Sequence, residues 1–266
     1  MKKYLVIGNP ITHSLSPELH NYWIKENGIN GIYDKEKFNE ENLKELFLKI
    51  KNKEIDGANI TVPFKQEVIP HLDHLSEEAH KTQSVNTVLL KDDKAIGHNT
   101  DIEGFEYSIK FNKIDLKNKN IFIMGAGGVV PSIIYALTKM QVSNITISNR
   151  TKSKAENLKK LFEKLKVIDW GEIPEFDMII NATSIGLNNQ EKINLDLPKV
   201  ENKFFYDVIY NPKETNFLKF GKQHGNKVFN GKMMFVYQAF FAFKLWHNKE
   251  PEINNDVLKL LDQWLE

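Results

Sequence analysis

Short apolar runs alternate with stretches of helical spacing along most of this chain. The runs that we expect to form strands are 4–7, 31–33, 57–61, 85–89, 95–97, 121–124, 145–148, 178–181, 204–207 and 228–230. Apolar residues at helical spacing follow Pro17, Lys65 and Asp101 and fill 42–50, 129–140, 233–246 and 256–265. This alternation predicts an α/β protein with mainly parallel sheet, arranged in two separate blocks.

One stretch, from Ile121 to Thr151, has the order strand, glycine turn, helix, strand. The turn consists of Gly125, Ala126, Gly127 and Gly128. Gly125 permits a tight turn, Gly127 lets backbone N–H groups approach a pyrophosphate, and the N-terminus of the next helix favours an anion. Pro131 suits the first turn of that helix, where its missing N–H would have had no partner. The stretch therefore predicts a dinucleotide-binding βαβ unit.

The residues after the second strand of this unit favour NADP over NAD. Units that bind NAD usually place Asp or Glu there, to accept a hydrogen bond from the ribose 2′-hydroxyl. This chain instead has Asn149, Arg150 and Thr151, with Lys154 one turn later. Arg150 is the single arginine among 36 basic residues, and a guanidinium can bind phosphate oxygens and stack on adenine. We expect Arg150 to contact the 2′-phosphate of NADP.

Composition narrows the class of protein. A chain of 266 residues with 41% hydrophobic and 27% charged residues is typical of a globular protein with one large or two medium domains. A net charge of +1 gives no reason to expect a nucleic acid or an anionic membrane as a partner. The absence of cysteine excludes disulfides, thiol nucleophiles and Cys-based zinc sites.

The lengths of the apolar runs also indicate where in the cell the protein is expected. The run at 4–7 is too short for a signal peptide, and the stretch 233–246 contains Gln238 and Lys244 and is too short to span a bilayer. We therefore expect a cytoplasmic protein. Three histidines, His71, His74 and His80, lie on a charged segment; we expect them on the surface and predict no metal site.

Four polar clusters lie beside the carboxyl ends of expected strands. They are Ser14 with Ser16; Asn59, Thr61 and Lys65; Asn86 with Thr87; and Asn99, Thr100 and Asp101. Ligands of open α/β sheets bind at that edge. The clusters offer hydroxyl, amide and ammonium groups, so they predict a site for a small polyhydroxylated molecule.

Lys65 and Asp101 are the candidate chemical pair. A lysine beside a carboxylate can donate a proton or a hydrogen bond to a carbonyl oxygen that gains negative charge, and recover the proton afterwards. Simpler interpretations stay open for both residues and for Ser16. Lys65 would be one of many surface lysines, Asp101 would cap the helix that begins at Ile102, and Ser16 would cap the helix that begins at Pro17.

Taken together, these motifs resemble the shikimate dehydrogenase family over nearly the whole chain. The matching segments are 14–17 (Ser-x-Ser), 59–65 (Asn-Val-Thr-x-Pro-x-Lys in the family), 85–87, 99–104, 149–151, 181–186, 207–215 (Asp-x-x-Tyr-x-Pro-x-x-Thr) and 231–238 (Gly-x-x-Met-x-x-x-Gln). Three positions depart from the family pattern: Gln83-Ser84 replaces Gly-Ala, Met233 stands where glycine is common, and Val130 replaces an alanine.

The resemblance implies a role for each matching residue. Lys65 would be catalytic with Asp101 as its partner, Ser14 and Ser16 would hold the substrate carboxylate, and Tyr210 would reach the same group. Substrate contacts are also implied for Asn59, Thr61, Asn86 and Gln238. Contacts with NADP are implied for Gly125, Ala126, Gly127, Gly128, Asn149, Arg150, Thr151, Lys154, Thr183 and Gly231.

The resemblance also implies a fold and an activity. A mainly parallel α/β substrate domain, 1–101 with 239–266, would accompany a Rossmann-type doubly wound NADP-binding domain, 102–238, with the active site in the cleft between them. The reaction would be the reversible NADPH-dependent reduction of 3-dehydroshikimate to shikimate, in chorismate and aromatic amino acid biosynthesis. We expect a monomer or a homodimer.

Three alternatives remain at the level of sequence. One is a quinate/shikimate dehydrogenase that uses NAD, and a second is a non-catalytic sensor of the same fold that binds shikimate-like ligands. The third, a 2-hydroxy-acid dehydrogenase, usually needs an arginine to bind the substrate carboxylate. Because the single arginine is already assigned to the nucleotide, the third class is disfavoured.

Overall fold

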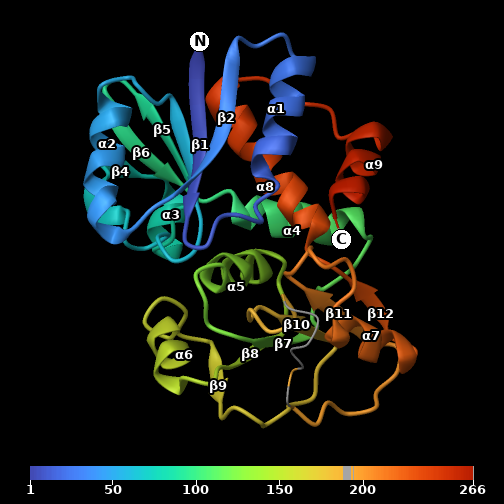
Figure 1. The fold of residues 1–266 in the computed structure, drawn as a ribbon. Helices are drawn as coiled ribbons and strands as arrows, with labels where there is room; N and C mark the ends of the chain where they lie inside the picture. The colour runs from blue at the N-terminus through green and yellow to red at the C-terminus, as the bar shows by residue number, and fades with distance from the viewer. Residues whose placement is uncertain (188–192, 194, 266) are drawn as a thin grey trace. The chain divides into compact units, whose positions relative to one another are not determined.

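The computed structural model describes residues 1–187, 193 and 195–265. The chain divides into two compact units (Figure 1). The first unit combines Met1–Gly104 with Val236–Trp264, and the second is formed mainly by Phe105–Phe235. Each unit is built on one six-stranded sheet. Within the described residues, no helix has the length and apolar character needed to cross a membrane.

The sheet of the first unit has the strand order β2-β1-β3-β5-β6-β4. The strands are β1 Lys2–Gly8, β2 Gly31–Lys37, β3 Gly57–Ile60, β4 His74–Leu75, β5 Thr87–Lys91 and β6 Lys94–His98. Strand β1 pairs in parallel with β2 and β3, and β4 pairs in parallel with β6. Strand β5 is antiparallel to β3 and β6. The predicted turn between β5 and β6 is confirmed, with Asp92 and Asp93 at φ 50° and 57°.

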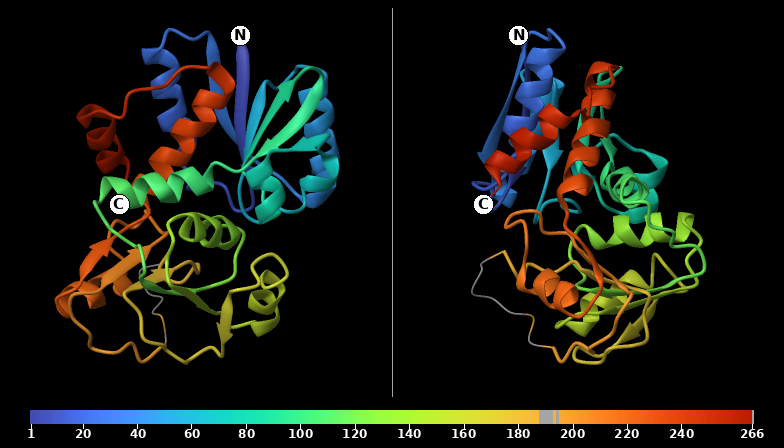
Figure 2. Two further views of the ribbon diagram at one scale, coloured as in Figure 1. Left: turned by 180° about the vertical axis from the view of Figure 1, so that it is seen from behind. Right: turned by 90° about the vertical axis from the view of Figure 1, so that its right-hand side faces the viewer.

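Helices cover both faces of this sheet (Figure 2). They are α1 Ser16–Glu26, α2 Leu43–Lys51, α3 Glu77–Thr82, α8 Lys232–His247 and α9 Asn255–Trp264, with short 3₁₀ turns η1 Glu40–Asn42 and η2 Ile69–His71. Side chains alternate along β1 as a strand requires. Leu5 and Ile7 join a core with four apolar residues of α2, whereas Tyr4 packs on Trp246 of α8 with ring centroids 4.9 Å apart.

Trp246 ties α8 to the middle of the sheet. Its indole Nε1 donates a hydrogen bond to the Val88 carbonyl at 3.0 Å. The ring lies over Gly57, where an added Cβ would stand 2.4 Å from that nitrogen. The glycine is therefore required by this close approach, and a segment near the C-terminus completes the core of the first unit.

The second unit has the dinucleotide-binding fold that the sequence predicts. Its strands are β7 Asn120–Met124, β8 Asn144–Ser148, β9 Lys166–Ile168, β10 Met178–Asn181, β11 Phe204–Asp207 and β12 Lys227–Phe229. All five pairings are parallel, in the order β12-β11-β10-β7-β8-β9. This is the doubly wound order of a Rossmann fold, which reverses direction between β7 and β10, where nucleotides bind.

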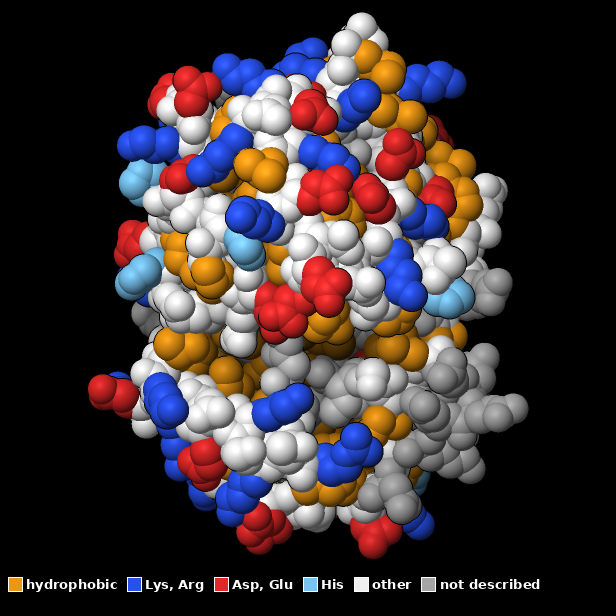
Figure 3. All heavy atoms as spheres, turned by 60° about the vertical axis from the view of Figure 1, so that its left-hand side comes forward, with side chains coloured by type: hydrophobic (Ala, Val, Ile, Leu, Met, Phe, Trp, Pro, Cys, Tyr) orange, Lys and Arg blue, Asp and Glu red, His pale blue; other side chains and the backbone are white. Residues whose placement is uncertain are grey.

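Three helices accompany this sheet in the described residues: α5 Val130–Lys139, α6 Lys152–Leu158 and α7 Asn216–Gln223. Helix α4, Asp101–Phe111, begins in the first unit and continues into the second. Pro131 occupies the first turn of α5, as expected. On the upper part of the face in Figure 3, lysine and acidic side chains are interspersed, so this part of the surface carries no field of one sign.

Two local predictions are wrong. Helix α1 begins at Ser16 rather than after it, its cap position is Leu15, and no side chain caps it. No α-helix follows Lys65; residues 62–68 form consecutive turns that end in η2. Pro70 has no N–H to donate to the Gln66 carbonyl, which instead accepts a bond from Ile69 at 3.1 Å.

A buried histidine makes the stability of the first unit depend on pH. His20 is fully buried, both ring nitrogens lack a hydrogen-bond partner, and the ring stacks on Tyr33 at 4.3 Å. Loss of hydration, with a smaller effect of nearby His247, lowers the pKa of His20 from 6.5 to about 3. Loss of hydration and nearby lysines likewise lower the pKa of His247 to about 4.

We expect acid to destabilise the protein from pH 6.5 downward. Below this pH, His20 binds a proton in the unfolded chain but stays neutral in the folded protein. The free energy of unfolding therefore falls by about 1.4 kcal/mol per pH unit because of this residue. Denaturant unfolding on both sides of pH 6.5 measures the slope. His20→Phe should lower the slope by about this amount and leave the part that comes from His247, whereas His13→Gln, at an exposed histidine, should leave the slope unchanged. An unchanged slope in His20→Phe would contradict the assignment.

Candidate active site

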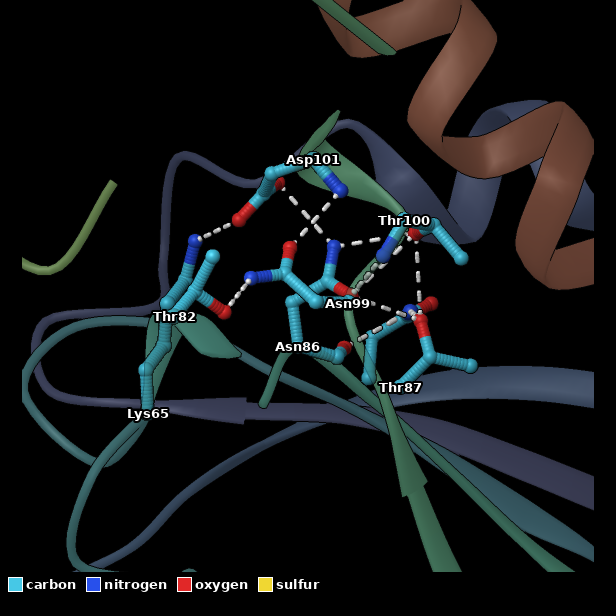
Figure 4. A network of polar contacts seen from close by, with 8 residues as sticks. Lys65, Thr82, Asn86, Thr87, Asn99, Thr100 and Asp101 are labelled. Carbon is cyan, nitrogen blue, oxygen red and sulfur yellow. Dashed lines mark hydrogen bonds and ion pairs between the residues drawn. The ribbon is translucent and has the colours of Figure 1, made fainter. Parts of the chain in front are cut away.

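The predicted chemical pair is formed in the first unit (Figure 4). Lys65 Nζ lies 2.5 Å from Asp101 Oδ2, and the two residues are only 7% and 6% exposed. Lys65 lies in the turns after β3, where its carbonyl accepts a hydrogen bond from the Val85 N–H at 2.8 Å. Asp101 is the first residue of α4. Lys65 is thus a buried residue with a fixed carboxylate partner, not one of the solvated surface lysines.

Asn86 holds the other oxygen of Asp101. Its Nδ2 donates to Asp101 Oδ1 and to Thr100 Oγ1, both at 3.0 Å, while its Oδ1 accepts from the Thr100 N–H at 2.8 Å. The Asp101 N–H donates to Asn99 Oδ1 at 3.2 Å. With both carboxylate oxygens bonded, the carboxylate cannot turn away from the ammonium. The pair can therefore present a proton donor in one fixed position.

Two buried residues that the sequence analysis did not single out support this network. Thr82 of α3 accepts a hydrogen bond from Asn99 Nδ2 at 2.9 Å and donates to the Glu78 carbonyl at 2.7 Å. Tyr33 of β2 donates to Asn59 Oδ1 at 2.6 Å. Neither lies in a recognisable motif, and only their positions in the folded chain reveal the contacts.

Asn59 extends the network to β3. Its Nδ2 donates to the Asn86 carbonyl at 3.1 Å and to Thr87 Oγ1 at 3.0 Å. The amide is 5% exposed, and Thr61, two residues later, is half-buried. Three of the predicted polar clusters therefore meet in one hydrogen-bonded group at one end of β3, β5 and β6.

The serine cluster lies in the loop between β1 and α1. Ser14 Oγ accepts a hydrogen bond from the Ser16 N–H at 3.3 Å. Lys35 of β2 holds this loop, because its Nζ donates to the Thr12 carbonyl at 2.8 Å and the Ser14 carbonyl at 3.3 Å. Ser14 is half-buried and Ser16 is buried. A carboxylate could accept hydrogen bonds from both hydroxyls here.

The glycine turn of the second unit follows β7, at the point where strand order reverses. Gly125 has φ 110°, and a Cβ added there would stand 2.6 Å from the Ala182 carbonyl oxygen. At Gly127 the nearest atom to an added Cβ is the same oxygen, at 4.0 Å. Gly125 is thus required by the fold, whereas Gly127 leaves open space in which a pyrophosphate could approach the backbone.

Substitution of the two glycines should separate folding from cofactor binding. Gly125→Ala is expected to lower the free energy of unfolding by about 1–3 kcal/mol, because of the positive φ and the contact with Ala182. Gly127→Ala should leave it nearly unchanged and raise the KM for NADP. Denaturant unfolding without cofactor measures the first effect and initial rates measure the second. Equal stability losses in the two variants would contradict this division.

The residues predicted to select NADP follow β8, which pairs in parallel with β7. Asn149 Nδ2 donates to the Thr151 carbonyl at 2.8 Å and so closes a small turn. Arg150 and Lys154 are exposed, and Thr151 occupies the cap position of α6. Arg150 therefore stands at the same edge of the sheet as the glycine turn, with its guanidinium accessible to a ligand.

Thr183 belongs to a hydrogen-bonded group at the ends of β10 and β11. Its Oγ1 donates to Asn181 Oδ1 at 2.7 Å, and Asn181 Nδ2 donates to Asp207 Oδ1 at 3.1 Å. Thr215 donates to Asp207 Oδ2 at 2.7 Å. Burial raises the pKa of Asp207 to about 6, against the opposing effect of these hydrogen bonds. The group joins the loop that carries Thr183 to the segment that carries Tyr210.

Tyr210 and Gly231 have defined packing in the same unit. The Tyr210 ring stacks on Phe235 with centroids 4.6 Å apart. A Cβ added at Gly231 would stand 2.1 Å from the Val208 carbonyl oxygen, so a side chain has no room there. Gln238 is a half-buried residue of α8, in the first unit. Each unit thus assembles its own part of the predicted site.

No group of three or more metal-ligating side chains occurs in residues 1–187, 193 and 195–265. The polar groups of the first unit are instead joined to one another, as Figure 4 shows. The chemistry that this arrangement supports is proton transfer by a buried ammonium–carboxylate pair.

Comparison with known proteins gives matches in both units. The family model described as "Shikimate dehydrogenase substrate binding domain" matches residues 6–88, and that described as "Shikimate / quinate 5-dehydrogenase" matches residues 108–214. The NADP(+) shikimate dehydrogenase of Pelagibacter ubique is 55% identical over 262 residues, which cover 98% of this chain and 99% of that protein.

Solved structures are similar over the same length. Shikimate dehydrogenase from Aquifex aeolicus matches with a TM-score of 0.89 and 37% identity, over 98% of this chain and 97% of that one. Shikimate 5-dehydrogenase from Thermus thermophilus, solved with NADP(H) and shikimate, matches with a TM-score of 0.90 and 30% identity over 100% of both chains.

Proposed function

This chain belongs to the shikimate dehydrogenase family, and on that basis we propose that it catalyses the reversible reduction of 3-dehydroshikimate to shikimate with NADPH. The observation that carries the proposal is the buried contact between Lys65 and Asp101, 2.5 Å long and braced by Asn86. A solvated surface lysine has no fixed position from which to donate a proton. Lys65 is held by the Asp101 carboxylate, which is in turn held by Asn86.

The residues of the second unit fit NADP. The parallel strands, with the reversal of strand order between β7 and β10, support binding of a pyrophosphate at the glycine turn. Gly127 leaves space beside the backbone, and the exposed Arg150 follows the neighbouring strand. When bound, the nicotinamide supplies the hydride for reduction and accepts it in the reverse direction.

The proton is the part of the reaction that this chain's own residues handle. As the carbonyl oxygen of 3-dehydroshikimate gains negative charge, the Lys65 ammonium donates a hydrogen bond and then a proton to it. Asp101 holds that ammonium in position, and Asn86 holds Asp101 in place. In the oxidation of shikimate, Lys65 takes the hydroxyl proton as the hydride leaves.

The other residues would bind and orient the two ligands. We assign the substrate carboxylate to Ser14, Ser16 and Tyr210. Further substrate contacts are assigned to Asn59, Thr61, Asn86 and Gln238, and NADP contacts to Gly125, Ala126, Gly127, Gly128, Asn149, Arg150, Thr151, Lys154, Thr183 and Gly231. The substrate role thus belongs mainly to the first unit and the cofactor role to the second. We place the enzyme in the cytoplasm, as a monomer or a homodimer.

Initial rates with shikimate and quinate, each with NADP and NAD, test this function. We expect the highest kcat/KM with shikimate and NADP. Comparable or higher rates with quinate and NAD would indicate a quinate/shikimate dehydrogenase. Shikimate binding without turnover would indicate a sensor, and no shikimate-dependent NADP reduction, where a known enzyme works, would remove the proposal.

A further inference from the structure

Tyr33 has no place in the reaction as derived so far, yet its phenol is joined to the substrate residues. It lies on β2, is 0% exposed, and its side chain reaches across β1 to Asn59 of β3. The Tyr33 hydroxyl donates to Asn59 Oδ1 at 2.6 Å, the shortest contact that the Asn59 amide makes. Because its side chain is fully buried, Tyr33 cannot itself touch a substrate.

The bonds around Asn59 allow one orientation of its amide. Both Nδ2 hydrogens are used, one on the Asn86 carbonyl at 3.1 Å and one on Thr87 Oγ1 at 3.0 Å. A flipped amide would place Oδ1 against the Asn86 carbonyl oxygen, which has no hydrogen to donate. The Tyr33 hydroxyl, which donates to Oδ1, favours the same orientation from the other side.

Tyr33 is itself held in position. The ring of His20 stacks on it with centroids 4.3 Å apart and an interplanar angle of 1°. Burial raises the pKa of Tyr33 well above its usual value, so the phenol keeps its proton and remains a donor. This buried hydroxyl therefore contacts Asn59, a residue to which we assign a substrate contact.

We propose that Tyr33 is a positioning residue for substrate binding, which fixes Asn59 so that its carbonyl oxygen, and not its NH2 group, meets a hydroxyl of the substrate. Oδ1 is the only group of the Asn59 amide that can form a further hydrogen bond, because both amide hydrogens are used and Oδ1 retains one lone pair. Asn59 is 5% exposed, whereas Tyr33 is fully buried. This inference rests on the proposed function.

The test is Tyr33→Phe, which removes the hydroxyl and keeps the ring. Asn59 Oδ1 then loses its buried donor, and the amide is held only by its two bonds on the NH2 side. We expect the KM for shikimate to rise about tenfold, with kcat changed less and the KM for NADP unchanged. The matched control is Tyr4→Phe, at a tyrosine that is 2% exposed and packs on Trp246 in the same unit. A purely structural role would lower the melting temperature without this selective change.

A double-mutant cycle shows whether Tyr33 acts through Asn59. In an Asn59→Ala background, Tyr33→Phe should change the KM for shikimate by less than about twofold, because the group that it positions is gone. The full tenfold effect in that background, or an unchanged KM for Tyr33→Phe alone, overturns the proposal. If wild-type protein itself shows no shikimate turnover, the proposed function fails instead.

Two substitutions at Asn59 test the orientation without altering Tyr33. Asp keeps an acceptor oxygen for a substrate hydroxyl, whereas Leu, of similar volume, has none. We expect Asn59→Asp to have a lower KM for shikimate than Asn59→Leu. The opposite ranking would mean that the amide NH2 faces the substrate, and would overturn the proposal even if Tyr33→Phe did not yield folded protein.

Discussion

Lys65→Ala is expected to lower kcat by about 10²–10⁴-fold while the KM for shikimate changes much less. The ammonium is the proton donor that we propose, and its 2.5 Å contact with Asp101 fixes it in the first unit. Its help is strongest when charge develops on the substrate oxygen, so its loss raises the barrier more than it weakens ground-state binding. Initial rates over a range of shikimate concentrations, at saturating NADP, separate the two effects.

A second lysine–aspartate pair provides the control. Lys51 Nζ lies 2.9 Å from Asp73, with the two side chains 42% and 34% exposed. Lys51→Ala removes the same atoms from a pair that has contact with solvent, so kcat should stay near the wild-type value. If Lys65→Ala also keeps its kcat, Lys65 does not take part in proton transfer.

Arg150→Ala is expected to raise the KM for NADP by about 10–100-fold and that for NAD far less. The two cofactors differ only in the 2′-phosphate, so a selective effect locates the guanidinium at that group. Arg150 is exposed after β8, at the edge of the sheet where the glycine turn lies. Initial rates with each cofactor, at saturating shikimate, give the ratio of the two effects.

Lys152→Ala is the matched control for this prediction. It removes a cation two residues away, which is paired with Asp169 at 2.7 Å. If Arg150 acts through the 2′-phosphate, the control should lack most of the selective effect. Equal changes in KM for NADP and NAD in Arg150→Ala would remove Arg150 from the choice of cofactor and leave the rest of the site unaffected.

The second unit could be predicted from sequence because its pattern is local. Strands buried on both faces, such as β7 and β10, read as continuous apolar runs, and the Gly125 turn lies directly between a strand and a helix. Strand β4, of two residues, is too short to leave a pattern; β9, of three residues, was also not predicted. The helix expected after Lys65 was wrong because apolar spacing between Pro63 and Pro70 imitates a helical face.

The site was predictable only in part. The polar clusters made Lys65 and Asp101 a candidate pair and the motif resemblance strengthened that prediction, but spacing alone could not show that two residues 36 positions apart are in contact. Tyr33 and Thr82 left no signal, since their roles depend on which strands become neighbours. From the sequence, Tyr33 looks like any core residue of a strand. Only the folded structure shows that its hydroxyl reaches Asn59 on β3.

The place of α8 in the first unit has a consequence for synthesis of the chain. The ribosome makes residues 1–104 first, but Trp246, which lies over Gly57 and bonds to Val88, comes near the end. The second unit is continuous over Phe105–Phe235, so all of its strands are available earlier. The second unit, although its synthesis begins later, can therefore finish folding before the first. Until α8 has been made, the face of β3 and β5 that it covers remains exposed.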